Sequence, residues 1–417
     1  MFVAIGNTPR DYAWGSATAI AEFRGTAPTG APEAELWLGA HAGSPAKLAD
    51  AASVGYADLA EWIAAEPARA LGEELASRGA RLPFLLKLLA AAAPLSLQAH
   101  PTPEQARAGF AREEADGVPI GAYDRNYRDR FHKPELIVAL SETFDALSGF
   151  RPQREVRGIL EVLRSADAAT ETPEPGALDL LESRLAGPDP LRDTVEWLLR
   201  DGRGGDTGEA AWVTERVTAL AASDLARNSA YALSFETVGV LAEAYPGDPG
   251  IVISLLLNRV RLRRGEALYL AAGNIHAYLD GLGIELMAAS DNVLRGGLTP
   301  KHIDVTELLD VLDFTPIAPP HLAAEPVGAG VVAFRPDVPD FVLYRAEPGA
   351  RGARVALAGP AIVLAEGGAL RIRGARGEAA VARGEAVFVT PEEGELAIEG
   401  DGIAWVATTG GPAAAVP

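Results

Sequence analysis

A seven-residue pattern occurs twice in this chain, and no other feature constrains the fold as strongly. Residues 264–270 read Arg-Gly-Glu-Ala-Leu-Tyr-Leu, and residues 383–389 read Arg-Gly-Glu-Ala-Val-Phe-Val. A polar turn that leads into a short apolar run is typical of a β-strand. We therefore predict two related β-barrels built from the same strand unit. The residues alone leave one alternative open, a common tight turn that precedes two unrelated strands.

The apolar pattern divides the chain into three parts, and 417 residues are too many for one core. In residues 151–250 apolar side chains recur every three or four positions, which predicts a helical insertion. Strand patterns with short helices occupy residues 1–150 and 251–315, and we predict that these form one domain with the candidate site. Residues 316–417 begin with a proline-rich linker and favour a C-terminal β-sandwich or jelly roll.

Charge and cysteine content exclude several functions. The net charge of −20 has the wrong sign for a nucleic-acid or membrane-surface partner, so a phosphorylated ligand would need locally placed cations. The absence of cysteine excludes disulfides and thiol catalysis and fits a reducing compartment. We find no signal-peptide pattern, and the most apolar run, residues 85–93, is too short to span a bilayer. We expect a soluble, cytoplasmic protein; its oligomeric state is unknown, and a monomer is compatible with the sequence.

Lysine is rare, and its positions are informative. Of 37 basic residues only four are lysines. Three of them, Lys87, Lys133 and Lys301, lie in or shortly before the motifs described below. Lysine offers a compact point charge that arginine cannot copy. These positions therefore indicate a charged site, with coincidence in a small sample as the alternative.

Four side chains offer donor atoms that suit a divalent metal. Residues two apart in a strand point to the same face, so Gln98 and His100 can lie side by side. With Glu135 and His276 they supply two nitrogens and two oxygens. Such a set suits zinc, with one position left for water or substrate. The first pair alone is weak evidence, because polar residues two apart are common in strands.

Four motifs agree, in order, with those of a known family. They are residues 97–101 (LQAHP), 132–135 (HKPE), 272–278 (AGNIHAY) and 290–301 (SDNVLRGGLTPK). Through about the first 315 residues the chain resembles the type I phosphomannose isomerases, which are zinc-dependent mannose-6-phosphate isomerases. The resemblance implies one zinc ion, and it assigns the ligands as Gln98, His100, Glu135 and His276.

The resemblance and the repeat together predict a mainly β fold with a helical insertion and cupin-like jelly-roll barrels. Laid over each other without gaps, the second copy of the repeat has Glu395 where the first has His276. No histidine follows His321. We therefore predict that one barrel is metallated and that the other is empty.

The resemblance also implies the chemistry. Aldose–ketose isomerisation moves a proton between adjacent carbons through an enediol, so it needs stabilised oxygen charge and a positioned base. Arg295 is our candidate for the fixed cation. We expect His132 and Lys133 to act as an acid/base pair with Asp291 as the orienting partner, and Glu285 is a further carboxylate of the active site. The sequence does not determine which residue is the base.

The phosphate group needs cations and donors away from the metal. Lys87, Ser96 and Lys301 resemble positions that the family uses for this purpose, with a solvated surface position as the alternative for each. We expect Tyr278 to shape the sugar pocket rather than to react. His41 receives no role beyond pocket wall or core, because Ala42 follows it where the family usually has proline.

We therefore expect a zinc enzyme that interconverts mannose 6-phosphate and fructose 6-phosphate. Two alternatives stay open, a non-catalytic metal-binding cupin module that senses a sugar and an isomerase of a related sugar phosphate. Arg295, Lys133 and the phosphate lysines argue against the first alternative. Epimer preference and the metal used in the cell cannot be read from the sequence.

Overall fold

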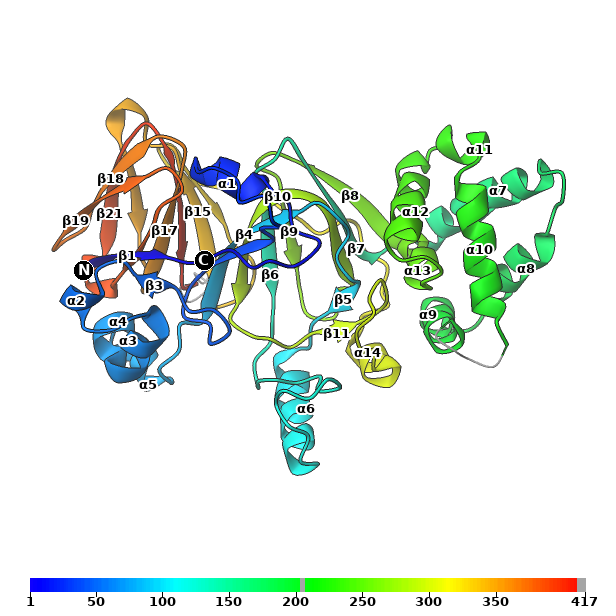
Figure 1. Ribbon diagram of the computed structural model, residues 1–417, viewed down its shortest axis with the longest axis horizontal. Helices are drawn as coiled ribbons and strands as arrows, with labels where there is room; N and C mark the ends of the chain where they lie inside the picture. The colour runs from blue at the N-terminus through cyan, green and yellow to red at the C-terminus, as the bar shows by residue number, and fades with distance from the viewer. Residues whose placement is uncertain (203–206, 411–417) are drawn as a thin grey trace, which may run out of the picture.

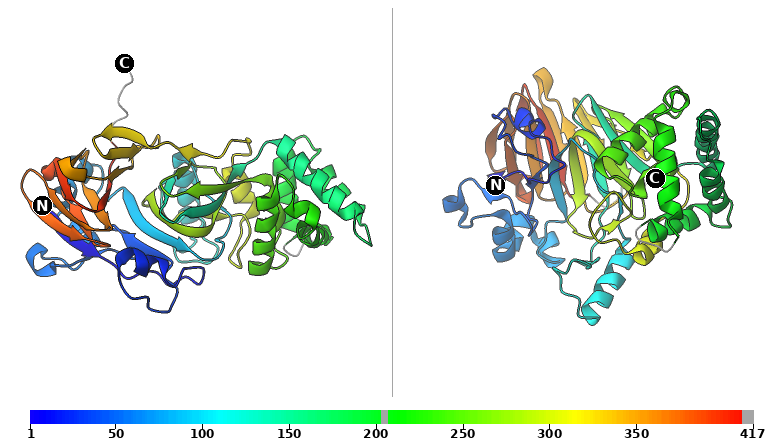
Figure 2. Two further views of the ribbon diagram at one scale, coloured as in Figure 1. Left: turned by 90° about the horizontal axis from the view of Figure 1, so that it is seen from above. Right: turned by 45° about the vertical axis from the view of Figure 1, so that its right-hand side comes forward.

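The computed structural model describes residues 1–202 and 207–410. In this part of the chain three blocks lie side by side along an elongated molecule, which Figure 1 and the view from above in Figure 2 both show. The C-terminal strands lie at the left of Figure 1, a second group of strands lies in the middle, and a group of helices lies at the right. No helix in the described ranges is both long and apolar enough to cross a membrane.

The middle block is a ten-stranded sheet whose longest strand, β10, pairs with β4, β5, β6 and β7. Every residue of β4 is buried. Its Leu88 joins the core that faces the C-terminal block, whereas Leu89 joins a core inside the middle block. The strands are β2 (Glu35–Leu38), β4 (Phe84–Ala91), β5 (Gln98–Ala99), β6 (Glu135–Ala139), β7 (Thr143–Phe150), β8 (Leu257–Arg263), β9 (Ala267–Leu270), β10 (His276–Ala288), β11 (Leu294–Arg295) and β12 (His321–Leu322).

The C-terminal block holds an eight-stranded and a four-stranded sheet with an apolar core between them. The larger sheet has the order β13-β14-β15-β22-β17-β20-β1-β3, and the smaller has the order β16-β21-β18-β19. The strands are β1 (Phe2–Gly6), β3 (Lys47–Leu48), β13 (Glu325–Gly328), β14 (Val331–Phe334), β15 (Val342–Ala346), β16 (Ala353–Ala356), β17 (Ala361–Glu366), β18 (Ala369–Arg373), β19 (Glu378–Ala382), β20 (Ala386–Val389), β21 (Glu395–Gly400) and β22 (Ile403–Thr408). Two short 3₁₀ turns are η1 (Gly349–Arg351) and η2 (Pro391–Glu393).

The first strand of the chain belongs to the C-terminal sheet. β1 pairs antiparallel with β20, with Ala4 opposite Val387, and β3 extends the same sheet. The sequence analysis placed residues 1–150 in the domain of the candidate site, and these strand pairings differ from that assignment. The pairing joins residues almost 400 positions apart in the sequence, so a local sequence pattern does not predict it. The rest of the domain division stays a prediction.

Both copies of the repeated pattern form the same turn before a strand. Gly265 and Gly384 both have positive φ, 85° and 75°, a region that favours glycine. The Glu266 carboxylate accepts the N–H of residue 263 at 2.8 Å, and the Glu385 carboxylate accepts the N–H of residue 382 at 3.0 Å. One copy leads into β9 and the other into β20. The pattern therefore marks an equivalent turn in each of the two β blocks.

Helices fill the interval between β7 and β8, as the apolar spacing predicts. In the described residues of this interval the helices are α7 (Gln153–Ala168), α8 (Pro175–Arg184), α9 (Pro190–Asp201), α10 (Glu209–Ala221), α11 (Asp224–Arg227), α12 (Ala232–Ala244) and α13 (Gly250–Leu256). The other helices are α1 (Ala19–Arg24), α2 (Ala51–Val54), α3 (Leu59–Ala65), α4 (Pro67–Leu71), α5 (Glu73–Ser77), α6 (Pro103–Ala115) and α14 (Val305–Val311). The expected mainly β fold with helices is confirmed, whereas one metallated and one empty barrel stay a prediction.

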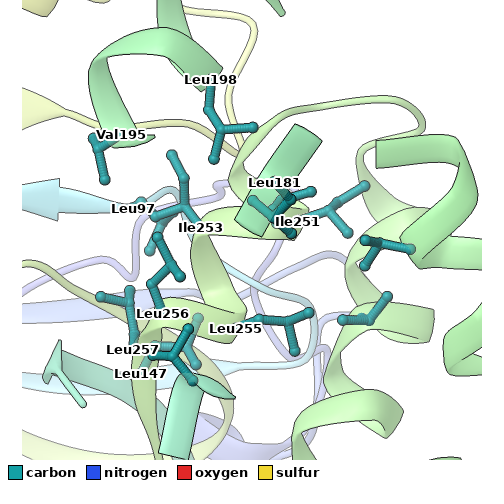
Figure 3. Close-up of a cluster of buried hydrophobic side chains, with 14 of the residues drawn as sticks. Leu97, Leu147, Leu181, Val195, Leu198, Ile251, Ile253, Leu255, Leu256 and Leu257 are labelled. Carbon is teal, nitrogen blue, oxygen red and sulfur yellow. The ribbon is translucent and has the colours of Figure 1, made fainter. Parts of the chain in front are cut away.

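The helical block and the middle sheet share one hydrophobic core. All seven residues of α13 are buried. Figure 3 shows Ile253 of this helix near Leu97, which precedes β5, and Leu256 near Leu147, which lies in β7. The last helix of the block, α13, therefore shares a core with the segment that leads into β5.

Candidate metal centre and active site

Three buried side chains from separate segments of the middle block lie close together. His100 follows β5, Glu135 begins β6 and His276 begins β10. One ligand-type atom of each lies within 4.8 Å of those of the other two, and each residue is 1% exposed. In the pairing of β5 with β10, Gln98 lies opposite His276. Strand pairing thus brings together residues that are far apart in the sequence.

Backbone carbonyls determine which nitrogen of each histidine carries a proton. The Nδ1 atom of His100 lies 2.8 Å from the carbonyl oxygen of Asn292, and Nδ1 of His276 lies 3.0 Å from that of Asn274. A carbonyl oxygen only accepts, so Nδ1 is the donor in both rings. The Nε2 atom of each neutral ring then keeps a lone pair. Burial, reinforced by the charge of Lys133, lowers the pKa of His100 to about 4, so this ring is neutral near pH 7.

The lone pairs of both histidines face the Glu135 carboxylate. The Nε2 atom of His100 lies 3.2 Å from Oε1 of Glu135, and Nε2 of His276 lies 3.3 Å from Oε2. Nε2 of His100 and Oε2 of Glu135 are buried without a hydrogen-bond partner. Buried acceptors that face each other without a shared proton are unfavourable unless a cation neutralises them. Two imidazoles and a carboxylate are a donor set that fits zinc.

Gln98, the fourth expected ligand, lies against the same cluster. Its amide Nε2 lies 3.3 Å from Nε2 of His276, and the residue is half-buried. The amide therefore meets the histidine lone pair that faces Glu135. Rotation of the amide by half a turn would present its oxygen to the same point. The structure thus brings all four expected ligands together.

The structure does not bring His132 and Lys133 together as a pair. The ammonium of Lys133 lies 3.0 Å from Oε1 of Glu135 and is largely buried. Nε2 of His132 instead lies 2.8 Å from Oδ2 of Asp340 in the C-terminal block. Neighbouring residues of an extended chain point in opposite directions, so the two side chains meet different partners. Lys133 contacts the candidate metal site, whereas His132 contacts the other β block.

Asp291 pairs with His41 rather than with His132. Its Oδ1 lies 3.3 Å from Nε2 of His41, and its backbone N–H donates to Asp129 at 2.8 Å. Burial raises the pKa of Asp291, but His41 and the charge of Lys133 outweigh this effect and lower it. Asp291 is therefore ionised near neutral pH, and the charge of Lys133 contributes to this effect. The sequence analysis gave His41 no role, and its partner is a tertiary contact that no motif indicates.

Lys87, expected at the phosphate, is instead enclosed by carboxylates. Its ammonium lies 2.8 Å from Oε2 of Glu285 and 3.3 Å from Oε1 of Glu35, and the residue is 5% exposed. Lys87 and Glu285 lie directly opposite in the pairing of β4 with β10. Burial opposes the charge of Lys87, but both carboxylates outweigh it and raise its pKa. Two carboxylates satisfy this cation, so its observed contacts differ from the expected phosphate contact.

Tyr278 is buried close enough to Glu285 and to the ligand candidate Glu135 to be affected by both charges. The Tyr278 hydroxyl is buried without a hydrogen-bond partner. Burial and the nearby charges of Glu285 and Glu135 raise the pKa of Tyr278, so the phenol stays neutral. Its ring packs edge-on against Phe144 with centroids 5.3 Å apart. The expected role of Tyr278 in shaping the sugar pocket stays a prediction.

Three cations gather on the other side of β5. Arg295 lies opposite Gln98 in the pairing of β11 with β5. Burial lowers the pKa of Arg295, and the charge of Arg128 lowers it further. The pKa of Lys301 is lowered by burial and by the charges of Arg295 and Arg128. In a chain of net charge −20, mutual repulsion of three cations marks a place suited to an anion.

Arg128 is a candidate site residue that was missed in the sequence analysis. Arg128 and two further arginines lie within residues 125–130 of an otherwise acidic chain, which is the signal that could have indicated it. The Asn292 side-chain oxygen accepts the N–H of Arg128 at 2.8 Å. Ser96 is half-buried just before β5, and its role stays a prediction.

Known proteins resemble the chain over nearly its whole length. A family profile described as phosphomannose isomerase type I, catalytic domain, matches residues 2–153. The mannose-6-phosphate isomerase of Escherichia coli (strain K12) is 36% identical over 399 residues, which cover 95% of this chain and 96% of that protein. The chain belongs to the type I phosphomannose isomerase family.

Other members of the phosphomannose isomerase family support this assignment. The human mannose-6-phosphate isomerase is 33% identical over 330 residues, 76% of this chain and 73% of that protein. A zinc-bound crystal structure of mannose 6-phosphate isomerase has a TM-score of 0.84 and 32% identity, and the match covers 98% of this chain and 99% of that one. The sequence analysis placed the resemblance in about the first 315 residues, and the comparisons extend it into the C-terminal block.

Proposed function

We propose that the chain is a zinc-dependent isomerase that interconverts mannose 6-phosphate and fructose 6-phosphate. The observation that carries this proposal is the buried cluster of His100, Glu135 and His276, with two Nε2 lone pairs facing one carboxylate. Family membership and the zinc-bound relative support both the metal and the substrate. The proposal includes a cytoplasmic location, which the lack of cysteine supports.

Each part of the site has one task in the proposed reaction. Gln98, His100, Glu135 and His276 would hold the ion, which when bound supplies a Lewis acid for negative charge on oxygen. The proton leaves C2 of the aldose and is returned to C1, while the proton of the O2 hydroxyl passes to O1. Arg295 stabilises the charge that then develops on the enediol oxygens.

Proton transfer and phosphate binding fall to different side chains. Of the two residues expected to move the proton, only Lys133 contacts the cluster. The proposal therefore keeps Lys133 and gives His132 no part in the transfer. Lys301 holds the phosphate with Arg128, and Lys87 instead fixes Glu285 at the pocket wall.

The substrate part of the proposal is tested by an assay with matched sugars. Formation of the corresponding ketose is measured with mannose 6-phosphate, with unphosphorylated mannose, which would give fructose, and with other aldose 6-phosphates. We expect mannose 6-phosphate to have the highest kcat/KM and mannose to lose at least about 100-fold, because it lacks the charge-assisted phosphate contacts. Equal rates with mannose would remove the phosphate site from the proposal. No turnover of any sugar would favour the sensing module.

A further inference from the structure

The turn that joins Arg295 to Lys301 has a strained backbone. Leu298 has φ of 54°, and it is the one non-glycine residue with positive φ in residues 1–202 and 207–410. Bulky residues avoid this region, and such conformations persist only where their surroundings enforce them. Leu298 is also fully buried. The strain lies three residues from each of the two cations assigned to the substrate.

One carboxylate from the helical block holds this turn. Oδ1 of Asp248, just before α13, accepts the backbone N–H of Leu298 at 2.9 Å and that of Gly250 at 2.8 Å. The two segments touch without side chains between them. A Cβ atom added to Gly297 would lie 3.0 Å from Cα of Gly250 and 3.1 Å from Oδ1 of Asp248. The turn therefore rests directly on the segment before α13.

The opposite side of the turn is held by the segment that carries Gln98. The N–H of Gly296 donates to the carbonyl of Leu97 at 2.8 Å, and the N–H of Leu97 donates to the carbonyl of Gly297 at 3.1 Å. Leu97 itself lies near Ile253 of α13 in the shared core (Figure 3). The turn is thus clamped between β5 and the start of α13.

We propose that Asp248 is a positioning residue of the substrate site. By holding Leu298 in its strained conformation, Asp248 directs Arg295 toward the reacting oxygens and Lys301 toward the phosphate. The inference rests on the proposed function, because that function places the phosphate at Lys301. It also gives the helical block a part in substrate binding, although none of the described residues of the block belongs to the metal cluster.

The test compares two substitutions at Asp248 with a control in the same block. Asp248→Ala removes the acceptor, whereas Asp248→Asn keeps an oxygen at the same place. Asp201→Ala is the matched control. The Asp201 carboxylate also accepts a backbone N–H, that of Ala210 at 2.8 Å, and its described contacts do not include the turn. Calorimetry on the zinc-loaded full chain gives the Kd of inorganic phosphate, and steady-state kinetics give KM for mannose 6-phosphate.

Losing one buried acceptor that positions the turn should raise the Kd of inorganic phosphate about tenfold in Asp248→Ala, with a parallel rise in KM. Asp248→Asn should stay within about twofold of wild type, because the acceptor remains. Asp201→Ala should bind phosphate as wild type does, even if it melts at a lower temperature. Wild-type phosphate affinity in a folded Asp248→Ala protein would overturn the inference, and so would an equal loss in Asp201→Ala.

A second variant keeps the inference testable if Asp248→Ala does not fold. A Cβ atom at Gly250 would lie 2.8 Å from Oδ1 of Asp248 and 2.9 Å from Cγ of Leu298, so Gly250→Ala disturbs the contact between Asp248 and the turn while the carboxylate is kept. It should weaken phosphate binding in the same direction, and unchanged affinity would contradict the inference. Phosphate binding and turnover are separate readouts. Wild-type protein that binds phosphate in this pattern but turns over no sugar would refute the proposed function and leave Asp248 in its role.

Discussion

The Nδ1 atoms of His100 and His276 each donate to a backbone carbonyl, and this detail decides what the residues can do. It fixes the tautomer, so that both Nε2 atoms face Glu135 as acceptors. The same logic separates Lys133 from His132, which are neighbours in the chain but contact Glu135 and Asp340 respectively. The resemblance of the motifs predicted the ligands, whereas the contacts of each side chain distinguish their roles.

Removal of the Arg295 side chain and removal of the Lys301 side chain should change different kinetic constants. The charge of Arg295 is needed most when the enediol oxygens become anionic, so Arg295→Ala should lower kcat by about 10² to 10³ with little change in KM. Lys301 binds the phosphate throughout the reaction, so Lys301→Ala should mainly raise KM. Steady-state kinetics on both variants measure the split. If Arg295→Ala kept kcat and only weakened binding, Arg295 would be a phosphate ligand.

At the scale of elements, strand pairing places charges that local patterns do not reveal. Asp145 of β7 lies opposite Arg261 of β8 and also contacts Arg259. Burial would raise the pKa of Asp145, but hydrogen bonds from both arginines outweigh it and lower the pKa to about 2. The two strands that flank the helical block are therefore tied together by an ionised carboxylate.

Asp145→Asn should lower the free energy of unfolding near pH 7 by about 1 to 2 kcal/mol, a value reduced because Arg261 is partly exposed. A carboxyl whose folded pKa is depressed stabilises above its unfolded pKa of about 4, and loses that contribution as the pH falls toward about 2. The difference between wild type and variant should therefore shrink as urea unfolding is repeated from pH 6 down to pH 3.

The control for this prediction is Asp280→Asn on the neighbouring strand. Burial and the charge of Asp145 raise the pKa of Asp280, so its ionised form opposes folding. Removing that charge should not destabilise the protein near pH 7. A loss of stability in Asp145→Asn that did not change with pH would show that packing, and not the ion pair, holds these strands together.

Periodic elements were predictable from the sequence, and long-range pairings were not. Residues such as Ile159 and Leu163 repeat at helical spacing, and they lie on the buried face of α7. The Arg-Gly-Glu repeat marked two equivalent turns because local hydrogen bonds within the pattern form them. By contrast, β1 joins β20 across almost the whole chain. The rarity of lysine likewise indicated that Lys87 belongs to a charged site, but it did not indicate that its partners are carboxylates.

At the scale of the whole molecule, the candidate site lies where the blocks meet. The core that holds α13 continues to Leu97, one residue before the expected ligand Gln98. On the other side, His132 joins the middle block to Asp340 of the C-terminal block. The acidic chain gathers Arg128, Arg295 and Lys301 beside this centre. The proposed activity therefore depends on a metal ion bound where these contacts converge.

Zinc content and turnover of mannose 6-phosphate, measured on the same samples, test that claim most directly. Wild-type protein should hold one zinc ion per chain, lose both metal and fructose 6-phosphate formation after chelation, and regain both when zinc is restored. His100→Ala should lose metal and activity together, because it removes a ligand, whereas His132→Ala should keep its zinc, because it contacts only Asp340 among the pairs described. Full turnover in protein shown to be free of metal would contradict the account.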